Sequence, residues 1–261
     1  MPSVSIIVPV FNSAPFIRSC LDSLAAQTLD DIEVILVDDH GNDESIPIVK
    51  AFIRDYNGAK RFRLVSTPAN GGPGKARNLG IEEATGKYLV FVDSDDGIEP
   101  EFCEELFKLA ESEDADLACC DININGVVKR NADISDKKHF LRHFVAYFTT
   151  FIYRKDLLMN SNIRFPEVSC AEDTCFLTCA ILSSSRAVQL HKAMYNYWLH
   201  SDSISTKKNP KRAATRIVAL KRALQFAKRH GYYKEYCFEL MFLFLKKGLG
   251  MAFKDVFFYI S

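Results

Sequence analysis

The segment Tyr88–Asp96, YLVFVDSDD, runs from five apolar or aromatic residues into three carboxylates. The apolar part has the length and character of a strand buried in a sheet. Asp93, Asp95 and Asp96 follow where this strand would end. Carboxylates this close repel one another unless a cation or a donor-rich ligand lies among them. The segment therefore predicts a buried strand that ends in a ligand-binding site.

The three acids have two interpretations. A hard divalent cation, Mn²⁺ or Mg²⁺, takes oxygen ligands and commonly bridges the phosphates of a substrate. Acids ahead of Pro100 would instead be solvated and complement the dipole of a helix expected to begin there. For Asp96 and Glu99 the helix interpretation is favoured. Asp93 and Asp95, which alternate outward from the strand end, favour the site.

Strand-like and helix-like patterns alternate along the first 120 residues. Strands are expected at VSIIVPVF, IEVILVDD, RFRLVST, YLVFVD and DLACCDI, with amphipathic segments between them. This alternation predicts an α/β fold with a mostly parallel central sheet, covered by helices on both faces. Ligands of such sheets bind at the carboxyl ends of the strands. The polar residues after the expected strands therefore become the candidate site.

Beyond Asp121 the alternation weakens. The segment ININGVVKRNADISD resembles a hairpin or loop, and AVQLHKAMYNYWLH a short pair of strands. Helices are expected at Asp136–Tyr147, Ala171–Ser184 and Pro210–His230. We expect a catalytic domain at 1–205, with halves 1–120 and 121–205, and a helical C-terminal extension at 206–261.

The loop NGGPGKARN, at residues 70–78, combines flexible backbone with Lys75 and Arg77 at the start of a helix. Such a helix start suits an anion. It is not a P-loop, because Ala76 follows Lys75 where Ser or Thr would stand, and it lacks the last glycine of G-x-G-x-x-G. A glycine-rich surface turn is the alternative, but a neighbouring metal site favours a diphosphate.

Four segments in this order resemble family 2 of the inverting glycosyltransferases, which have the GT-A nucleotide-sugar fold. They are SIIVPVFN, VILVDDHGNDES, NGGPGKARNLGIEEATGKYLVFVDSDD and FPEVSCAEDTCF. The resemblance is dense over residues 3–120 and thinner as far as Ser205. Each motif alone is unspecific, whereas the ordered set is highly specific.

The resemblance implies roles for individual residues. Asp93-Ser94-Asp95 matches the D-x-D motif, in which Asp95 binds the metal and Asp93 leans toward the ribose. Asp173 matches the catalytic base, with Glu172 as its neighbour. The remaining candidates, implied to contact the donor, are Pro9, Val10, Phe11, Asn12, Asp39, Gly72, Lys75, Arg77 and Ser94.

The chemistry agrees with these roles, because sugar transfer needs a base for the acceptor hydroxyl and a stabilised leaving group. Attack from the side of Asp173, opposite the diphosphate, would invert the anomeric carbon. The alternative for Asp173 is N-terminal helix charge, and the motif context favours the base. His200 is a further candidate metal or diphosphate contact, with a surface histidine as the alternative.

The net charge of zero conceals an asymmetry. Residues 203–261 hold 13 Lys and Arg against 3 Asp and Glu, whereas residues 1–202 hold 20 against 30. A basic, aromatic tail suits an anionic membrane surface. Packing against the acidic body or a second subunit is the alternative. The eight cysteines lie mostly in apolar runs, which favours buried thiols over disulfides or a metal site.

The leading hypothesis is a metal-dependent glycosyltransferase that uses a nucleotide sugar, with UDP-sugar preferred, and a cell-surface glycan or lipid-linked precursor as acceptor. A sugar-nucleotide-forming nucleotidyltransferase would carry a glycine-rich loop after the first strand, and PVFNSAP has none. A non-catalytic nucleotide-sugar-binding protein is the other alternative. We expect a cytoplasmic protein that touches the inner face of the membrane, with no nucleic-acid partner; a homodimer stays open.

Overall fold

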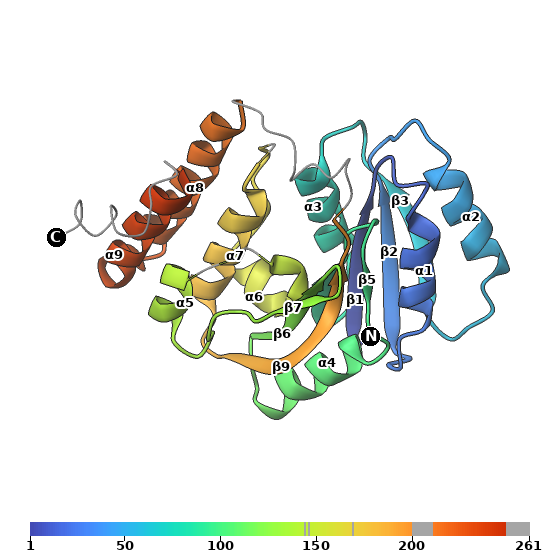
Figure 1. Cartoon of the computed structure of the whole chain (residues 1–261), viewed down its shortest axis with the longest axis horizontal. Helices are drawn as coiled ribbons and strands as arrows, with labels where there is room; N and C mark the ends of the chain where they lie inside the picture. Colours follow the sequence, from blue (N-terminus) through green and yellow to red (C-terminus); the bar gives the residue numbers. More distant parts are fainter. Residues whose placement is uncertain (144, 146, 169, 200–210, 249–261) are drawn as a thin grey trace.

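Four parallel strands form the half of the sheet that carries the predicted nucleotide edge (Figure 1). The computed structural model describes residues 1–143, 145, 147–168, 170–199 and 211–248. In it β1 (Val4–Val10) lies between β2 (Ile32–Asp38) and β4 (Tyr88–Phe91), and β3 (Arg61–Ser66) pairs with the far side of β2. All seven residues of β1 are buried, as expected for a central strand covered on both faces.

The second half of the sheet is mixed. Over the described residues the nine strands run in the order β3-β2-β1-β4-β8-β6-β9-β5, with β7 paired to β6. The remaining strands are β5 (Gly97–Ile98), β6 (Leu117–Ile124), β7 (Val127–Lys129), β8 (Phe151–Arg154) and β9 (Ala187–Tyr197). Two sequence-based expectations are corrected here. Strand β8 was not predicted. The strand pair expected at AVQLHKAMYNYWLH is instead the single strand β9, which pairs in parallel with β6 across a register shift.

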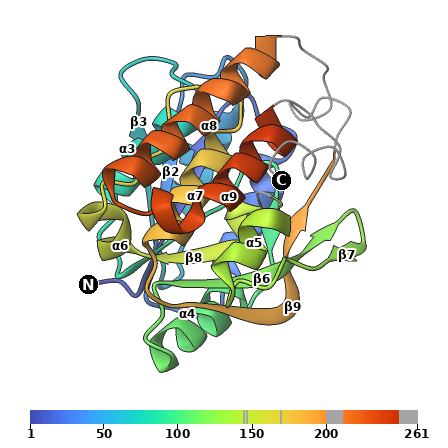
Figure 2. The same ribbon diagram turned by 90° about the vertical axis from the view of Figure 1, so that its left-hand side faces the viewer.

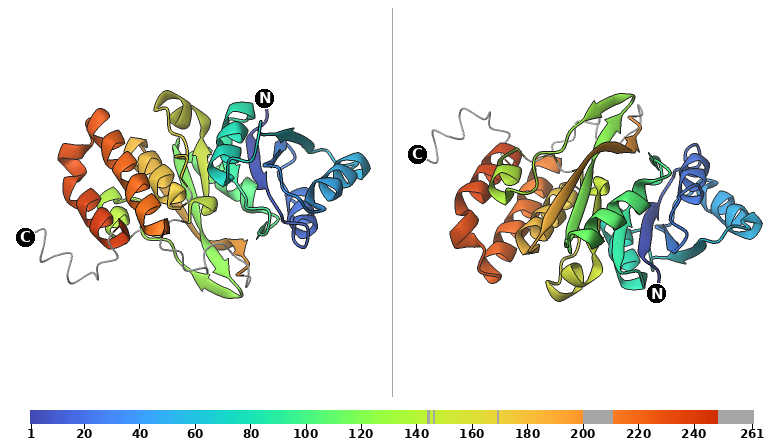
Figure 3. Two further views of the ribbon diagram at one scale, coloured as in Figure 1. Left: turned by 90° about the horizontal axis from the view of Figure 1, so that it is seen from above. Right: turned by 90° about the horizontal axis from the view of Figure 1, so that it is seen from below.

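Helices cover both faces of the sheet, which confirms the predicted fold class (Figure 3). Alternate residues of β1 and β2 point into two separate apolar clusters. One cluster joins the sheet to α1 (Ile17–Ala25), α2 (Ser45–Asp55) and α4 (Phe102–Ser112). The other joins it to α3 (Pro73–Glu83), α5 (Lys137–His143), α6 (Lys155–Asn160) and α7 (Glu172–Ser183). The short 3-10 helix η1 (Phe148–Thr150) leads into β8.

The C-terminal helices form an outer layer on this second face (Figure 2). Helix α8 (Lys211–Arg229) packs on α7, and α9 (Tyr233–Leu243), continued by the π-helical turn η3 (Phe244–Gly248), packs on α5. Arg142 on α5 forms an ion pair of 2.6 Å with Glu239 on α9, whose side chain is 3% exposed. This part of the basic tail therefore docks on the chain's own second core cluster.

The outward face of α8 is nevertheless cationic. Four of the basic side chains that the structure describes on α8 are exposed: Lys221, Arg222, Lys228 and Arg229. Among the helices that the structure describes, none combines the length and hydropathy needed to cross a membrane.

The strand register brings the polar strand ends together. Val10 lies beside Asp38, Asp38 beside Ser66, and Ile7 beside Phe91. The residues that follow these strands consequently meet at one edge of the sheet, as the parallel topology predicts. We call this the donor edge, defined by Asn12, Asp39, Thr67 and Asp93.

Candidate active site

Asp39 organises the glycine-rich loop at the donor edge. Its carboxylate is 2% exposed and accepts hydrogen bonds from the backbone amides of Gly71, at 2.9 Å, and Gly72, at 2.8 Å. The Thr67 hydroxyl donates to the same carboxylate at 3.1 Å. Gly72 has φ 82°, in the left-handed region, and precedes Pro73 at the start of α3. Asp39 thus fixes the loop that begins α3, and the loop amides at 71 and 72 are directed to it.

The turn after β1 lies beside this loop. Pro9 and Val10 are buried, whereas Phe11 is 48% exposed. Asn12 has φ 47°, and its side-chain oxygen accepts a hydrogen bond from the amide of Asn42 at 2.8 Å. A positive φ in a non-glycine residue is uncommon and suits a tight turn at a binding edge. Phe11 is therefore the side chain of this turn that is available to stack on a planar ligand.

Arg77, one turn into α3, is 5% exposed and lies between two charged neighbours. One terminal nitrogen donates to Asp93 Oδ1 at 2.6 Å, and the other lies 3.5 Å from Glu172 Oε1. The attraction of these carboxylates outweighs burial and raises the pKa of the guanidinium. The predicted direct contact between Arg77 and the nucleotide stays untested, and its partners in the structure are protein carboxylates. Lys75 is the more exposed cation of the loop, 3.3 Å from Glu167.

The D-x-D segment has three different environments. Asp93 is held by Arg77, Ser94 is buried at 8% exposure, and Asp95 is partly exposed. Asp96 is buried at 3% exposure and accepts hydrogen bonds from the Tyr195 hydroxyl, at 2.7 Å, and the Trp198 amide, at 3.0 Å.

The predicted solvated role of Asp96 is wrong. Helix α4 begins at Phe102, six residues after Asp96, with Glu104 and Glu105 in its first turn. Instead Asp96 ties the strand end to β9. Burial, followed by the charges of Asp93 and Asp95, raises the pKa of Asp96 to about 8. The sequence signal that was missed lies in β9, where Tyr195 in YNYW supplies the hydroxyl.

Asp173 is the second residue of α7, and its neighbour Glu172 faces Arg77 of α3. Ala171, the residue before α7, has φ 63°, a strained conformation for alanine that turns the chain into the helix. The amide of Thr174 donates to Asp173 Oδ1 at 2.6 Å. Burial, followed by the charge of Glu172, raises the pKa of Asp173 to about 6, although Thr174 and Arg77 oppose this shift. A carboxylate with this pKa can accept a proton and is charged at neutral pH.

The donor set of this site suits a hard cation, although it is incomplete by itself. Within the described residues, no three His, Cys, Asp or Glu side chains are grouped to hold a metal. Asp93 and Asp95 both lie near enough to Asp96 that their charges add to burial in raising its pKa. Carboxylate oxygens at an edge with excess negative charge fit Mn²⁺ or Mg²⁺, which commonly complete their coordination with phosphates and water. Asp95 would hold the ion; His200 lies outside the described residues.

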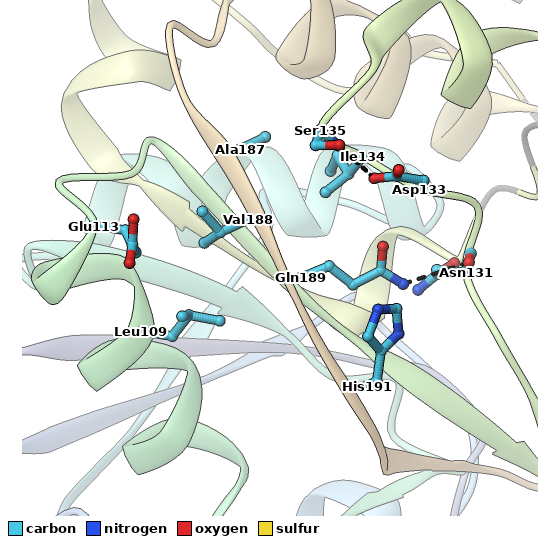
Figure 4. Close-up of a pocket in the computed structure, with 10 residues that line it drawn as sticks. All are labelled: Leu109, Glu113, Asn131, Asp133, Ile134, Ser135, Ala187, Val188, Gln189 and His191. Atoms are coloured by element: carbon cyan, nitrogen blue, oxygen red, sulfur yellow. Dashed lines mark hydrogen bonds between the residues drawn. The ribbon is translucent and has the colours of Figure 1, made fainter.

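A cavity of about 610 Å³ lies elsewhere in the molecule (Figure 4). It opens beside the first residues of β9, and Gln189 in its wall donates to the carbonyl oxygen of Asn131 at 3.4 Å. Ala187 pairs with Leu117 at the start of β6, whereas Tyr195, farther along β9, reaches Asp96. The cavity is therefore separate from the donor edge, and none of the predicted site residues lines it.

The described geometry brings together three parts of the predicted site. Asp39 holds the glycine-rich loop, Asp93 begins the carboxylate turn, and Asp173 opens the helix across from it. Arg77 links the last two parts through Glu172. This arrangement agrees with the GT-A nucleotide-sugar fold that the sequence resemblance implies.

The chain belongs to the glycosyl transferase family 2, whose sequence model matches residues 5–179. It is 28% identical over 268 residues to the putative glycosyltransferase EpsH of Bacillus subtilis strain 168, an alignment that covers 96% of this chain and 76% of EpsH. It is 34% identical over 223 residues to the uncharacterized glycosyltransferase EpsJ of the same organism, covering 78% of this chain and 63% of EpsJ.

A solved structure carries the same fold. The crystal structure of Staphylococcus aureus TarS 1–349 in complex with UDP-GlcNAc matches with a TM-score of 0.74 and 26% identity, covering 92% of this chain and 72% of that one. In sequence the chain is 34% identical over 208 residues to the poly(ribitol-phosphate) beta-N-acetylglucosaminyltransferase TarS of strain MW2, covering 76% of this chain and 35% of TarS. The chain thus spans about a third of full-length TarS.

Proposed function

We propose that the protein transfers a sugar from a UDP-sugar to a hydroxyl of a cell-surface glycan or its lipid-linked precursor, with inversion at the anomeric carbon. The observation that carries the proposal is the position of Asp173, whose helix is linked by Arg77 to the carboxylate turn at the donor edge. The match to a structure with bound UDP-GlcNAc supports a UDP-sugar donor. A relative that acts on poly(ribitol-phosphate) supports an envelope polymer as acceptor.

Asp173 is the base of this reaction. Its carboxylate takes the proton of the acceptor hydroxyl as the oxygen attacks the anomeric carbon, and the bond to the diphosphate breaks on the opposite side. One displacement of this kind inverts the anomeric configuration. The raised pKa of Asp173, about 6, makes the carboxylate a stronger base than an exposed aspartate while it stays charged at neutral pH.

The donor edge serves the nucleotide. Asp93 would receive the ribose, Phe11 and Asp39 would line the base, and Lys75 would face the diphosphate. A divalent ion at Asp95, when bound, supplies positive charge against the departing diphosphate. Arg77 is already paired with Asp93 and Glu172, so it acts on the substrates through these two residues and not by direct contact.

The donor is testable without knowledge of the acceptor. We expect UDP and one or more UDP-sugars, in the presence of Mn²⁺, to raise the melting temperature, because a ligand that binds only the folded state stabilises it by about 2.7 kcal/mol at 100 times its Kd. A differential scanning panel of UDP-, GDP-, CMP- and dTDP-sugars checks this. Stabilisation by none of them would overturn the nucleotide-sugar proposal, and preference for a GDP- or dTDP-sugar would correct the donor.

Peripheral contact with the inner face of the cytoplasmic membrane is the second part of the proposal. The exposed cations of α8 support it, because a basic residue near an anionic surface contributes about 1 kcal/mol. We expect the variant with Lys221, Arg222, Lys228 and Arg229 all changed to Gln to lose most of its sedimentation with anionic vesicles at low salt.

The matched control removes four cations from exposed sites elsewhere: Arg18, Lys50, Arg54 and Lys108. It should bind these vesicles like the wild type. Equal vesicle binding by all three proteins, or none by the wild type, would contradict membrane contact through α8. Circular dichroism confirms that both variants keep the packed helices.

A further inference from the structure

We propose that Arg77 is a positioning residue that sets Asp173 relative to the donor edge by bridging Asp93 and Glu172, an inference that rests on the proposed function. Its two terminal nitrogens point to carboxylates on different elements, one after β4 and one on α7. These two elements carry opposite halves of the site. A side chain that contacts both can therefore fix the distance between donor and base.

An aromatic pair fixes the guanidinium between these carboxylates. Its central carbon lies 4.7 Å from the ring centre of Phe148 and 5.3 Å from that of Phe165. Phe165 in turn stacks on Phe176 of α7, with ring centres 3.9 Å apart and nearly parallel planes. Arginine stacks on aromatic faces because its planar charge is weakly hydrated. The bridge is thus held by packing as well as by charge.

The surroundings argue against Arg77 as a direct ligand of the diphosphate. Its side chain is only 6% exposed, and both of its terminal nitrogens face protein carboxylates. A guanidinium engaged at 2.6 Å with Asp93 would have to break that buried pair to reach a ligand. Removing one partner from a buried ion pair is strongly destabilising. Arg77 therefore acts through Asp93 and Glu172.

The pKa of Asp173 provides a second readout of this role, because it depends on the charged groups around the carboxyl. The groups that face Asp173 are Glu172 on its own helix, Arg77 on α3 and Tyr153 on β8. Glu172 raises the pKa of Asp173 and Arg77 lowers it. If Arg77 is removed, Asp173 loses this favourable charge and Glu172 loses its partner, so the pKa of Asp173 should rise further. If Glu172 becomes neutral, the pKa of Asp173 should fall.

The test compares Arg77→Met, Arg77→Lys and Glu172→Gln with the wild type over a range of pH. We expect Arg77→Met to lose about 100-fold in kcat, because misplacement of about 1 Å costs on that order. The acid limb of its pH profile should move to higher pH, and that of Glu172→Gln to lower pH. Arg77→Lys keeps the charge but can reach only one carboxylate, so kcat should fall while the acid limb moves less.

The matched control is Arg63→Met. Arg63 also lies between two carboxylates, Glu33 at 3.7 Å and Glu83 at 2.7 Å, but at the opposite end of the sheet. This variant should lose stability and keep the wild-type acid limb. If Arg77→Met also loses stability and keeps the wild-type acid limb, the positioning role is overturned. The proposed function still holds in that case, provided that the wild type transfers sugar.

A wild type that transfers no sugar would overturn the proposed function instead. The role of Arg77 is then decided by titration of the Asp173 carboxyl carbon by nuclear magnetic resonance in the same proteins. Opposite movements of the Asp173 pKa in Arg77→Met and Glu172→Gln support the bridge, and an unchanged pKa in both overturns it. If Arg77→Met does not fold, Arg77→Lys takes its place beside Glu172→Gln, whose site is 16% exposed, and the same comparison of the Asp173 pKa decides the role.

Discussion

The Asp173→Asn variant is expected to bind the donor like the wild type and to transfer sugar about 1,000-fold more slowly, within the range ascribed to general-base catalysis. Asparagine keeps the size of the side chain and can still accept the hydrogen bond from Thr174, so α7 should begin in the same way. It cannot take a proton from the acceptor hydroxyl. The loss should therefore fall on kcat, measured with saturating donor, while the donor Kd from calorimetry stays unchanged.

The pH profile gives this prediction a second measurement. Because burial and Glu172 raise the pKa of Asp173 to about 6, the wild type should lose activity as the pH falls through 6 and the base becomes protonated. The residual activity of Asp173→Asn should lack this acid limb. Asp156→Asn is the matched control, since Asp156 is an exposed acid in the first turn of α6. Undiminished transfer by Asp173→Asn would place the base elsewhere.

The donor edge was predictable from sequence because local chemistry and topology coincide there. Each of β1, β2 and β4 is a nearly unbroken apolar run, and parallel strands must put their carboxyl ends at the same edge. The order of the short motifs then identified which polar residues meet. The positions of Asp39 and Asp93 at this edge could therefore be predicted without knowledge of distant contacts.

The second half of the sheet was less predictable, because its strands do not repeat the helix-and-strand alternation. Strand β8 has only four residues and runs directly into α6, so no turn signal separates the two. Strand β9 changes register against β6 on both sides of Asp121, and two exposed residues at the first shift, His191 and Lys192, break its pattern. One bulged strand therefore looked like two strands.

The partners of the charged residues were also hidden from sequence reasoning. Asp96 is followed by a glycine and a helix, which favoured a solvated turn, but its donors are Tyr195 of β9 and Trp198 just after it, about 100 residues later. Arg77 looked like an anion contact because it opens a helix after a glycine-rich loop. Its aromatic neighbours, Phe148 and Phe165, and its second carboxylate, Glu172, come from distant segments whose placement depends on tertiary packing. Long-range contacts of this kind leave no local pattern.

The Asp95→Asn variant is expected to lose metal-dependent donor binding and to reduce transfer by about 100-fold, because the ion would no longer offset several kcal/mol of developing charge on the diphosphate. Mn²⁺ should raise the melting temperature of the wild type with UDP, and this increment should vanish in the variant. EDTA should reduce wild-type transfer and leave the residual activity of Asp95→Asn unchanged. Calorimetry of Mn²⁺ in the presence of UDP measures the lost affinity directly.

Stability separates this effect from misfolding. Asp95 adds to the negative charge that raises the pKa of Asp96, so its neutralisation relieves repulsion in the metal-free protein. The free energy of unfolding of metal-free Asp95→Asn, from urea titration, should therefore equal or exceed that of the wild type, as expected for a residue kept for function at a cost in stability. Asp22→Asn, at an exposed site paired with Arg18, is the control and should keep both metal response and activity. If the wild type still transfers sugar in the presence of EDTA, the proposed metal-binding role of Asp95 is wrong.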